Sequence, residues 1–164
     1  MANFSFDIVS DYNKSEMNNV YMQAEREITN RYDFKGTPAA IEWLDGKDGM
    51  RLIGSGEWQI EAVLDIVRKK LANREVSSKV LDLTKPINES NLRATKEIPF
   101  KKGLTQENSK KISKEIREKH KKVKSQIQGD GVRVSSSSKD ELQAVMATVS
   151  QLDVDVPIQF INFR

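Results

Sequence analysis

The sequence predicts an α+β protein made of two similar small domains. The first observation is an internal repeat: residues 48–67 match residues 130–149 without a gap, with seven identical pairs in twenty positions. Two copies, eighty-two residues apart, indicate a duplicated domain and not a solenoid. The second observation is the order of elements, which is strand, helix, strand, strand, helix, strand in each half. That order suits a four-stranded antiparallel sheet with two helices on one face, the ferredoxin-like arrangement.

The first half begins with a predicted strand at residues 4–10, where Phe6 and Ile8 alternate with polar residues. Apolar residues then recur at helical spacing from Met17 to Ile28. The next predicted elements are a hairpin over residues 39–54, a helix from Ile60 to Leu71 with Ser55 as its cap, and a short strand at residues 80–83.

Residues 85–91 have no periodicity and several turn formers, so they are the predicted linker. The second half repeats the order. Its predicted elements are a strand at residues 94–100, a helix at 105–120, a hairpin at 123–136, a helix from a capping box at Ser138 and Glu141, and a final strand at 157–163.

The composition narrows the class of protein. Charged residues make up 31% and apolar residues 37% of the chain, which is typical of soluble globular proteins. The apolar runs are too short to cross a bilayer, and the first seven residues lack the pattern of a signal peptide. The absence of cysteine excludes disulfides and thiolate metal sites and fits a reducing cytosol. We therefore expect a cytoplasmic protein without a membrane partner.

Positive charge is concentrated in one segment. Residues 101–124 contain ten Lys or Arg against three Glu, so this segment carries +7 and the rest of the chain −4. Such a distribution favours an anionic partner, although a solvated helix face would have the same composition.

Motifs for catalysis or metal binding are missing. The sequence has no glycine-rich phosphate-binding loop and a single histidine, His120, so we expect neither a metal nor another cofactor. Ser135 to Ser138 have no base nearby in the pattern, and we interpret them as a strand end and a helix cap. A phosphate-handling enzyme is the weakest alternative, because no acid/base pair is recognisable.

The second sheet is the better candidate for ligand binding. Strand alternation directs Lys124, Gln126 and Gln128 outward, and Arg133 lies outward on the neighbouring strand. Cations can bind phosphates and carboxamides can bind base edges. The alternative is an ordinary solvated face. In the first half, Arg51 is accompanied by Glu42, which makes a poorer surface for anions.

Four further residues complete the predicted site. Lys101 and Lys102 begin the basic segment and could contact phosphates, and Lys35 is a secondary candidate. Alternation places Phe160 and Phe163 on opposite faces, so only one can stack on a base, and Phe160 is the candidate platform. The aromatic consensus of RNA-recognition modules is absent, which favours binding through phosphates.

Six motifs of the chain are distinctive: SFDIVS (5–10), RYDFKG (31–36), QIQGD (126–130), VRV (132–134), DELQAVM (140–146) and QFINFR (159–164). They resemble the YajQ family of bacterial nucleotide-binding proteins. The resemblance implies that the two domains exchange their first strands, which gives one domain of residues 11–100, completed by strand 94–100, and one of residues 1–10 and 101–164. It also implies that the protein binds nucleotides or nucleic acid and has no settled catalytic activity; some members of the family bind cyclic di-GMP and act on transcription. Ser135–Ser138 replace the family's usual Thr-Gly-Lys-x, which removes a lysine.

The leading hypothesis is therefore a non-enzymatic binder of RNA, of a GTP-like nucleotide or of a cyclic di-GMP-like ligand. The alternative is an adaptor that docks an acidic protein partner on the basic helix 105–120.

Overall fold

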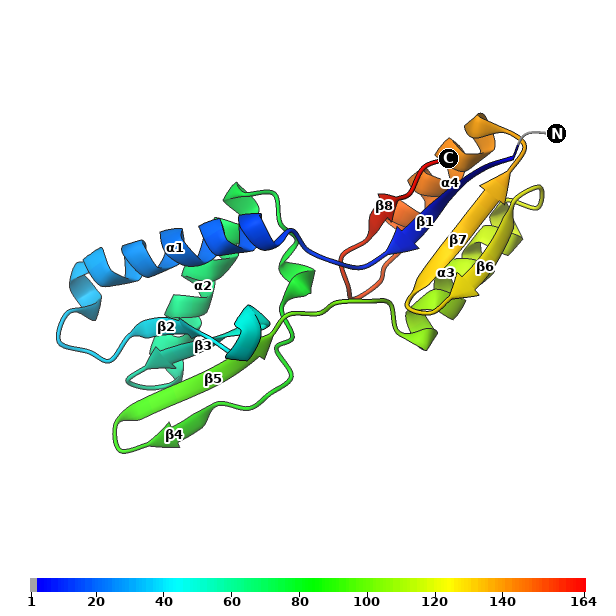
Figure 1. Ribbon diagram of the computed structural model, residues 1–164. Coiled ribbons are helices and arrows are strands. Elements are labelled where there is room, and N and C mark those ends of the chain that lie inside the picture. Colours follow the sequence, from blue (N-terminus) through cyan, green and yellow to red (C-terminus); the bar gives the residue numbers. More distant parts are fainter. Residues whose placement is uncertain (1–2) are drawn as a thin grey trace. The chain divides into compact units, whose positions relative to one another are not determined.

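The computed structural model describes residues 3–164, which form two compact units (Figure 1). The terminal unit contains the N-terminal segment up to Asp11 and residues Lys102–Arg164, and the central unit is Tyr12–Lys101. The predicted α+β class, with two four-stranded antiparallel sheets and four helices in the described part of the chain, is confirmed. None of these helices is long and apolar enough to cross a membrane.

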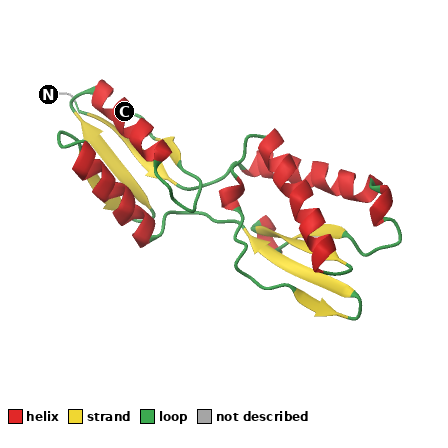
Figure 2. Ribbon diagram, turned by 180° about the vertical axis from the view of Figure 1, so that it is seen from behind, coloured by secondary structure: helices red, strands yellow, loops and turns green. Residues whose placement is uncertain are grey.

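The terminal unit has a sheet with the strand order β6-β7-β1-β8. Phe6 and Ile8 of β1 are fully buried beneath two helices, which cover one face of the sheet (Figure 2). Asp7 points to the other, open face, where it lies opposite Arg133 in the register. The elements are β1 (Phe4–Val9), α3 (Gln106–Lys119), β6 (Lys124–Gln128), β7 (Gly131–Ser136), α4 (Lys139–Gln151) and β8 (Gln159–Ile161).

The central unit has a separate core and a sheet with the strand order β2-β3-β5-β4. Met17 and Val20 of its first helix and Leu64 and Val67 of its second are buried against this sheet. Its elements are α1 (Lys14–Asn30), β2 (Ala40–Trp43), β3 (Gly49–Gly54), α2 (Glu57–Asn73), β4 (Asn88–Ser90) and β5 (Arg93–Pro99).

The chain passes from one unit to the other twice, after Asp11 and after Lys101. As a result, β1 pairs with β7 and β8, which follow it by more than a hundred residues. In the same way, β5 pairs with β3 and β4 of the central unit, although the helix that follows it lies in the terminal unit.

Four predictions about elements are wrong. The N-cap of α2 is Gly56 and not Ser55, whose own amide donates to Gln59 Oε1 at 2.8 Å. Residues 88–90 of the expected linker form the edge strand β4, which turns into β5 through Asn91 and Leu92. The expected strand at residues 80–83 is a 3₁₀ turn at Ser78–Val80 followed by one bridge from Leu81 to Phe100. The last strand ends at Ile161, because Asn162 has a φ of 57° and leaves the extended conformation.

The identical Asp-Gly pairs of the repeat have a steric cause. Gly49 and Gly131 begin β3 and β7, where the neighbouring strand passes very close. A Cβ atom at Gly49 would lie 2.6 Å from the carbonyl oxygen of Ile98, and one at Gly131 would lie 3.0 Å from that of Ile8. Glycine therefore allows the backbone contact at the same point of both sheets.

Candidate nucleotide-binding surface

Four of the eight predicted residues lie together on the open face of the terminal sheet. Lys124, Gln126 and Gln128 alternate on the edge strand β6 with exposed side chains. Arg133 lies opposite Gln126 in the register of β6 and β7. The strand alternation read from the sequence therefore places these side chains on one surface.

Arg133 is bound by a carboxylate that the sequence reasoning missed. Its Nε donates to Asp7 Oδ1 at 2.9 Å and its Nη2 to Oδ2 at 3.4 Å, and Asn162 donates to the same Oδ2 at 2.8 Å. The hydrogen bond from Arg133 lowers the pKa of Asp7 despite the opposing effect of burial. Asp7 therefore stays ionised and offsets the charge of Arg133. Its outward position on the first strand was the signal that could have revealed it.

The central sheet repeats this arrangement. Arg51, which matches Arg133 in the repeat, donates to Glu42 at 3.0 Å and to Glu97 at 3.2 Å. Lys85 also reaches Glu97, at 3.3 Å. Each sheet thus holds its central arginine with carboxylates from adjacent strands, and neither arginine is an uncompensated cation.

A small hollow of about 150 Å³ lies beside Arg133. Its lining includes Gln128 and Asn162, but also the carboxylates Asp7 and Asp130. Two carboxylates disfavour a phosphate by like-charge repulsion. The hollow suits a neutral polar group, and phosphates need a different part of the surface.

Helix α3 supplies that part. Lys110, Lys114 and Arg117 are exposed and follow one another at i, i+4 and i+7, so they share one stripe of the helix. Lys121 continues this stripe in the turn before β6, and we name the four residues the basic row. Among residues 3–164, no carboxylate forms an ion pair with any of the four.

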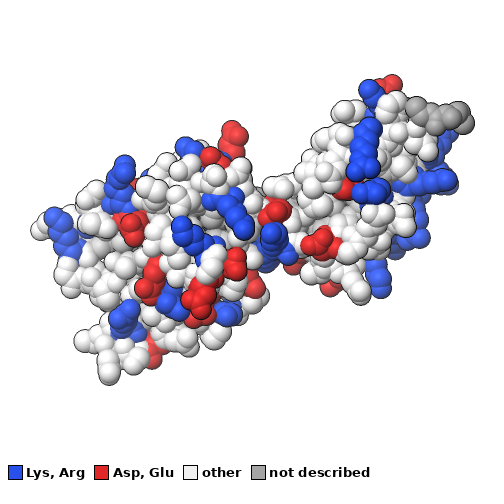
Figure 3. All heavy atoms as spheres, in the orientation of Figure 1, with Lys and Arg blue, Asp and Glu red and all other residues white. Residues whose placement is uncertain are grey.

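The basic row faces the margin of the terminal unit at β6. Lys110 and Arg117 lie three residues before and four residues after Ser113, whose hydroxyl is 2.9 Å from that of Ser125 in β6. Lys111, about 100° round the helix from Lys110, instead donates to the carbonyl oxygen of Asp153 just beyond α4. Lys124 and Gln126 are exposed on the adjacent edge strand. Figure 3 shows Lys and Arg side chains gathered along this margin, at the right of the view.

The other four predicted residues lie elsewhere. Lys101 belongs to the central unit, where its backbone amide donates to Val80, and Lys102 belongs to the terminal unit. Lys35 follows a 3₁₀ turn of the central unit, with Nζ 6.0 Å from the ring centroid of Tyr32.

Phe160 does not lie on the open face. It is opposite Ile8 in the register and packs edge-on against Phe6, with ring centroids 5.5 Å apart. Phe163 also stacks on Phe6, at 6.0 Å, so the expectation of opposite faces is wrong. The cause is Asn162, whose positive φ interrupts the alternation between the two rings.

No cluster of His, Asp or Glu in residues 3–164 could hold a metal ion. The side chains of the basic row and the outward side chains Lys124, Gln126 and Gln128 of β6 are cations and carboxamides, which suit the binding of phosphates and base edges.

Comparison with known proteins agrees with this chemistry. A family model described as "Nucleotide-binding protein YajQ-like" matches residues 4–164. The chain is 47% identical, over the full length of both proteins, to a protein of Nocardioides sp. (strain ATCC BAA-499 / JS614) named nucleotide-binding protein. Proteins of the same name from Trichodesmium erythraeum and Thermobifida fusca are each 45% identical, over 97% or more of both chains.

Proposed function

Because the chain belongs to the YajQ-like family of nucleotide-binding proteins, we propose that it binds nucleic acid in the cytoplasm, without catalysis, at the margin formed by α3 and β6. The observation that carries this proposal is the basic row beside a polar edge strand. Phosphates would be contacted by the basic row, Lys110, Lys114, Arg117 and Lys121. The neighbouring nucleotides of the same strand would be contacted by Lys124, Gln126 and Gln128 of β6.

The spacing of the row supports a polyanion as the ligand. With a rise of about 1.5 Å per residue, Lys110 and Arg117 are about 10 Å apart along the helix axis, which spans more than one phosphate. Lysine and arginine without carboxylate partners are available for such contacts. A ligand with a single phosphate would engage only part of the row.

Single-stranded RNA is the nucleic acid that fits this margin best. Unpaired bases expose their edges, and the carboxamides of Gln126 and Gln128 can both donate and accept hydrogen bonds. The hydrogen bond from Gln128 Nε2 to Gln126 Oε1 is long, at 3.4 Å, and therefore weak, so a base edge can replace it. Because Phe160 packs against Phe6 on the helix-covered face, binding through phosphates is favoured over stacking.

A binding titration at several salt concentrations tests this proposal. Fluorescence anisotropy with labelled single-stranded RNA and DNA should give a plot of log K against log salt with a slope of about −3, from four phosphate contacts at about 0.7 each. Calorimetry with GTP and cyclic di-GMP tests the small ligands, for which the slope should be shallower. A regulatory effect on transcription is a further proposal that depends on one of these ligands binding.

Matched variants locate the site. The triple variant Lys110→Gln, Lys114→Gln, Arg117→Gln should bring the slope close to −1. The control Lys69→Gln, Lys79→Gln, Arg93→Gln removes the same charge from exposed positions of the central unit and should leave the slope unchanged. An equal loss in both variants, or no binding of any nucleic acid, contradicts the proposal.

An adaptor function is the second candidate, because the same row could dock an acidic protein. Charge reversal at Lys110, Lys111 and Lys114 would then abolish capture of the partner while nucleotide binding survives. Loss of RNA binding in this variant favours the nucleic-acid function instead.

A further inference from the structure

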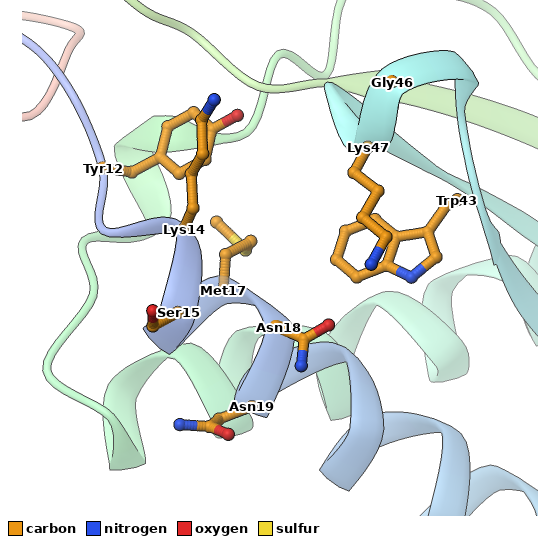
Figure 4. A pocket seen from close by; sticks show the side chains of 9 residues that line it. All are labelled: Tyr12, Lys14, Ser15, Met17, Asn18, Asn19, Trp43, Gly46 and Lys47. Atoms are coloured by element: carbon orange, nitrogen blue, oxygen red, sulfur yellow. The ribbon is translucent and has the colours of Figure 1, made fainter.

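The central unit contains a pocket of about 480 Å³, which lies within the size range of small-molecule sites. One wall is formed by the start of α1 and the segment before it, with Tyr12, Lys14, Met17 and Asn18. The other wall is formed by the end of β2 and the turn after it, with Trp43 and Lys47. Figure 4 shows the two walls facing each other across the opening.

An aromatic side chain is fixed in this pocket. The indole of Trp43 stacks on Tyr21 with ring centroids 4.2 Å apart and an interplanar angle of 15°, and it meets Phe100 edge-on at 6.5 Å. Trp43 is only half-buried, so part of the ring stays accessible from the pocket. Met17 and Tyr12 are 1% and 9% exposed and provide an apolar floor. Such a surface suits a flat, largely apolar group.

The charged side chains that line the pocket are both cations. Lys14 and Lys47 stand on opposite walls and are both exposed, and neither forms an ion pair within residues 3–164. Lys47 Nζ lies 5.5 Å from the centroid of the Trp43 ring, a cation–π contact. Two cations at the mouth of an apolar pocket suit a ligand with an anionic end.

Asn18 adds a group that can orient the ligand. Its Nδ2 donates only to the sulfur of Met22, at 3.5 Å, and sulfur is a weak acceptor. The carboxamide can therefore exchange this contact for a hydrogen bond to a polar edge. By contrast, the helix amide of Glu16 already donates to the side chain of Asn13 and is not free for a ligand.

We infer that this pocket binds a single nucleotide, with the base against Trp43 and the phosphates between Lys14 and Lys47. Base–aromatic stacking tolerates any base, and the carboxamide of Asn18 can hydrogen-bond the base edge. Lys47 leaves the indole face when the base enters and binds a phosphate instead. This site is separate from the basic row, and its occupation does not depend on whether the row binds nucleic acid.

The full-length chain with Trp58→Phe provides a direct test. Trp58 is 65% exposed, and its replacement leaves Trp43 as the only tryptophan of the chain. GTP and ATP should quench the emission of Trp43 in a saturable manner. Guanosine and adenosine, which lack phosphates, should bind at least tenfold more weakly, because charge-assisted hydrogen bonds are lost.

Calorimetry on variants then assigns the phosphate contacts. Lys14→Ala with Lys47→Ala should raise the Kd for GTP and ATP at least tenfold and leave the weak binding of the nucleosides unchanged. The control Lys69→Ala with Lys79→Ala should bind like the parent chain, and so should the triple variant of the basic row.

Two results would overturn this inference. One is an unchanged Kd in the Lys14 and Lys47 variant. The other is nucleotide binding that disappears in the triple variant of the basic row, which would assign the nucleotide to the terminal unit. Failure of RNA to bind the row would contradict the proposed function alone, because the nucleotide titration reports only on Trp43.

Discussion

Replacing Gly49 by alanine tests whether the close approach of β5 to β3 requires glycine. The new Cβ would lie 2.6 Å from the oxygen of Ile98, 2.8 Å from Cα of Pro99 and 2.7 Å from Cδ1 of Leu44. Two of these three atoms belong to the backbone, so a rotation of a side chain cannot relieve the contact. We expect β5 to shift away from β3.

The matched substitution Gly131→Ala serves as the comparison for the change in the free energy of unfolding. There the Cβ would lie 3.0 Å from the oxygen of Ile8 and 3.2 Å from Cγ1 of Val9, so shifts of a few tenths of an ångström are enough. Overpacking costs about 1–3 kcal/mol, and alanine gains about 0.4–1 kcal/mol by restricting the unfolded chain. We therefore expect Gly49→Ala to lower the free energy of unfolding by about 2 kcal/mol and Gly131→Ala to change it by less than about 1 kcal/mol.

Urea denaturation can follow the two units separately. Both tryptophans and all three tyrosines lie in the central unit, so intrinsic fluorescence reports on Gly49 and not on Gly131. Amide exchange, resolved by residue, reports on the terminal unit, and far-UV circular dichroism reports on both units together. If Gly49→Ala stays within about 0.5 kcal/mol of the parent chain, or if Gly131→Ala is the more destabilising of the two, close strand contact does not explain why glycine occurs at these two matched positions of the repeat.

Three further substitutions or conditions have defined outcomes. Asp7→Asn should strengthen RNA binding about twofold, because β1 lies two strands, about 10 Å, from β6, where one negative charge repels a phosphate by about 0.4 kcal/mol in water. Weaker binding in anisotropy would contradict this and would show that Asp7 positions Arg133. Leu92→Gly should raise the free energy of unfolding by about 0.5–1 kcal/mol in fluorescence-monitored urea titrations, because Leu92 has a φ of 66° and is 89% exposed; a destabilised central unit would contradict this. Hydrogen bonds from arginine lower the pKa of Asp7 and of Glu97 below their ordinary values of 3.8 and 4.5. The two carboxylates therefore contribute fully to stability above these ordinary values, and the contribution is lost as the pH falls below them. A free energy of unfolding that does not fall between pH 5 and pH 3 would exclude this contribution.

The sequence predicted the helices and the hairpins because their periodicity is local. The spacing of Ile112 and Ile116 in α3 and the alternation around Phe6 and Ile8 in β1 both correspond to buried positions. Alternation also placed Lys124, Gln126 and Gln128 on one exposed strand face. These features depend on neighbours within a few residues.

The remaining features depend on contacts that periodicity does not contain. The Arg133–Asp7 pair joins residues that are 126 positions apart, and it requires the register of β1 against β7. Phe163 stacks on Phe6 because one residue, Asn162, adopts a positive φ. The pocket at Trp43 requires the stacking of β2 on α1, which brings Lys14 and Lys47 to one opening. No pattern in the sequence links these residues.

The path of the chain through its two units is that of one domain inserted into another. The central unit is a continuous stretch whose ends are adjacent, since the rings of Tyr12 and Phe100 lie 5.2 Å apart. In the terminal unit, the amide of Gly103 donates to Ser10 at 2.7 Å, so the chain leaves and re-enters at neighbouring points.

The ends of the described chain are also neighbours, because Ser5 and Arg164 exchange two backbone hydrogen bonds. A circular permutant that begins at residue 12 and joins residue 164 to residue 3 by a short linker would therefore contain two uninterrupted domains in tandem. In that chain β1 would follow β8 as an ordinary hairpin partner, and each duplicated domain could be expressed alone.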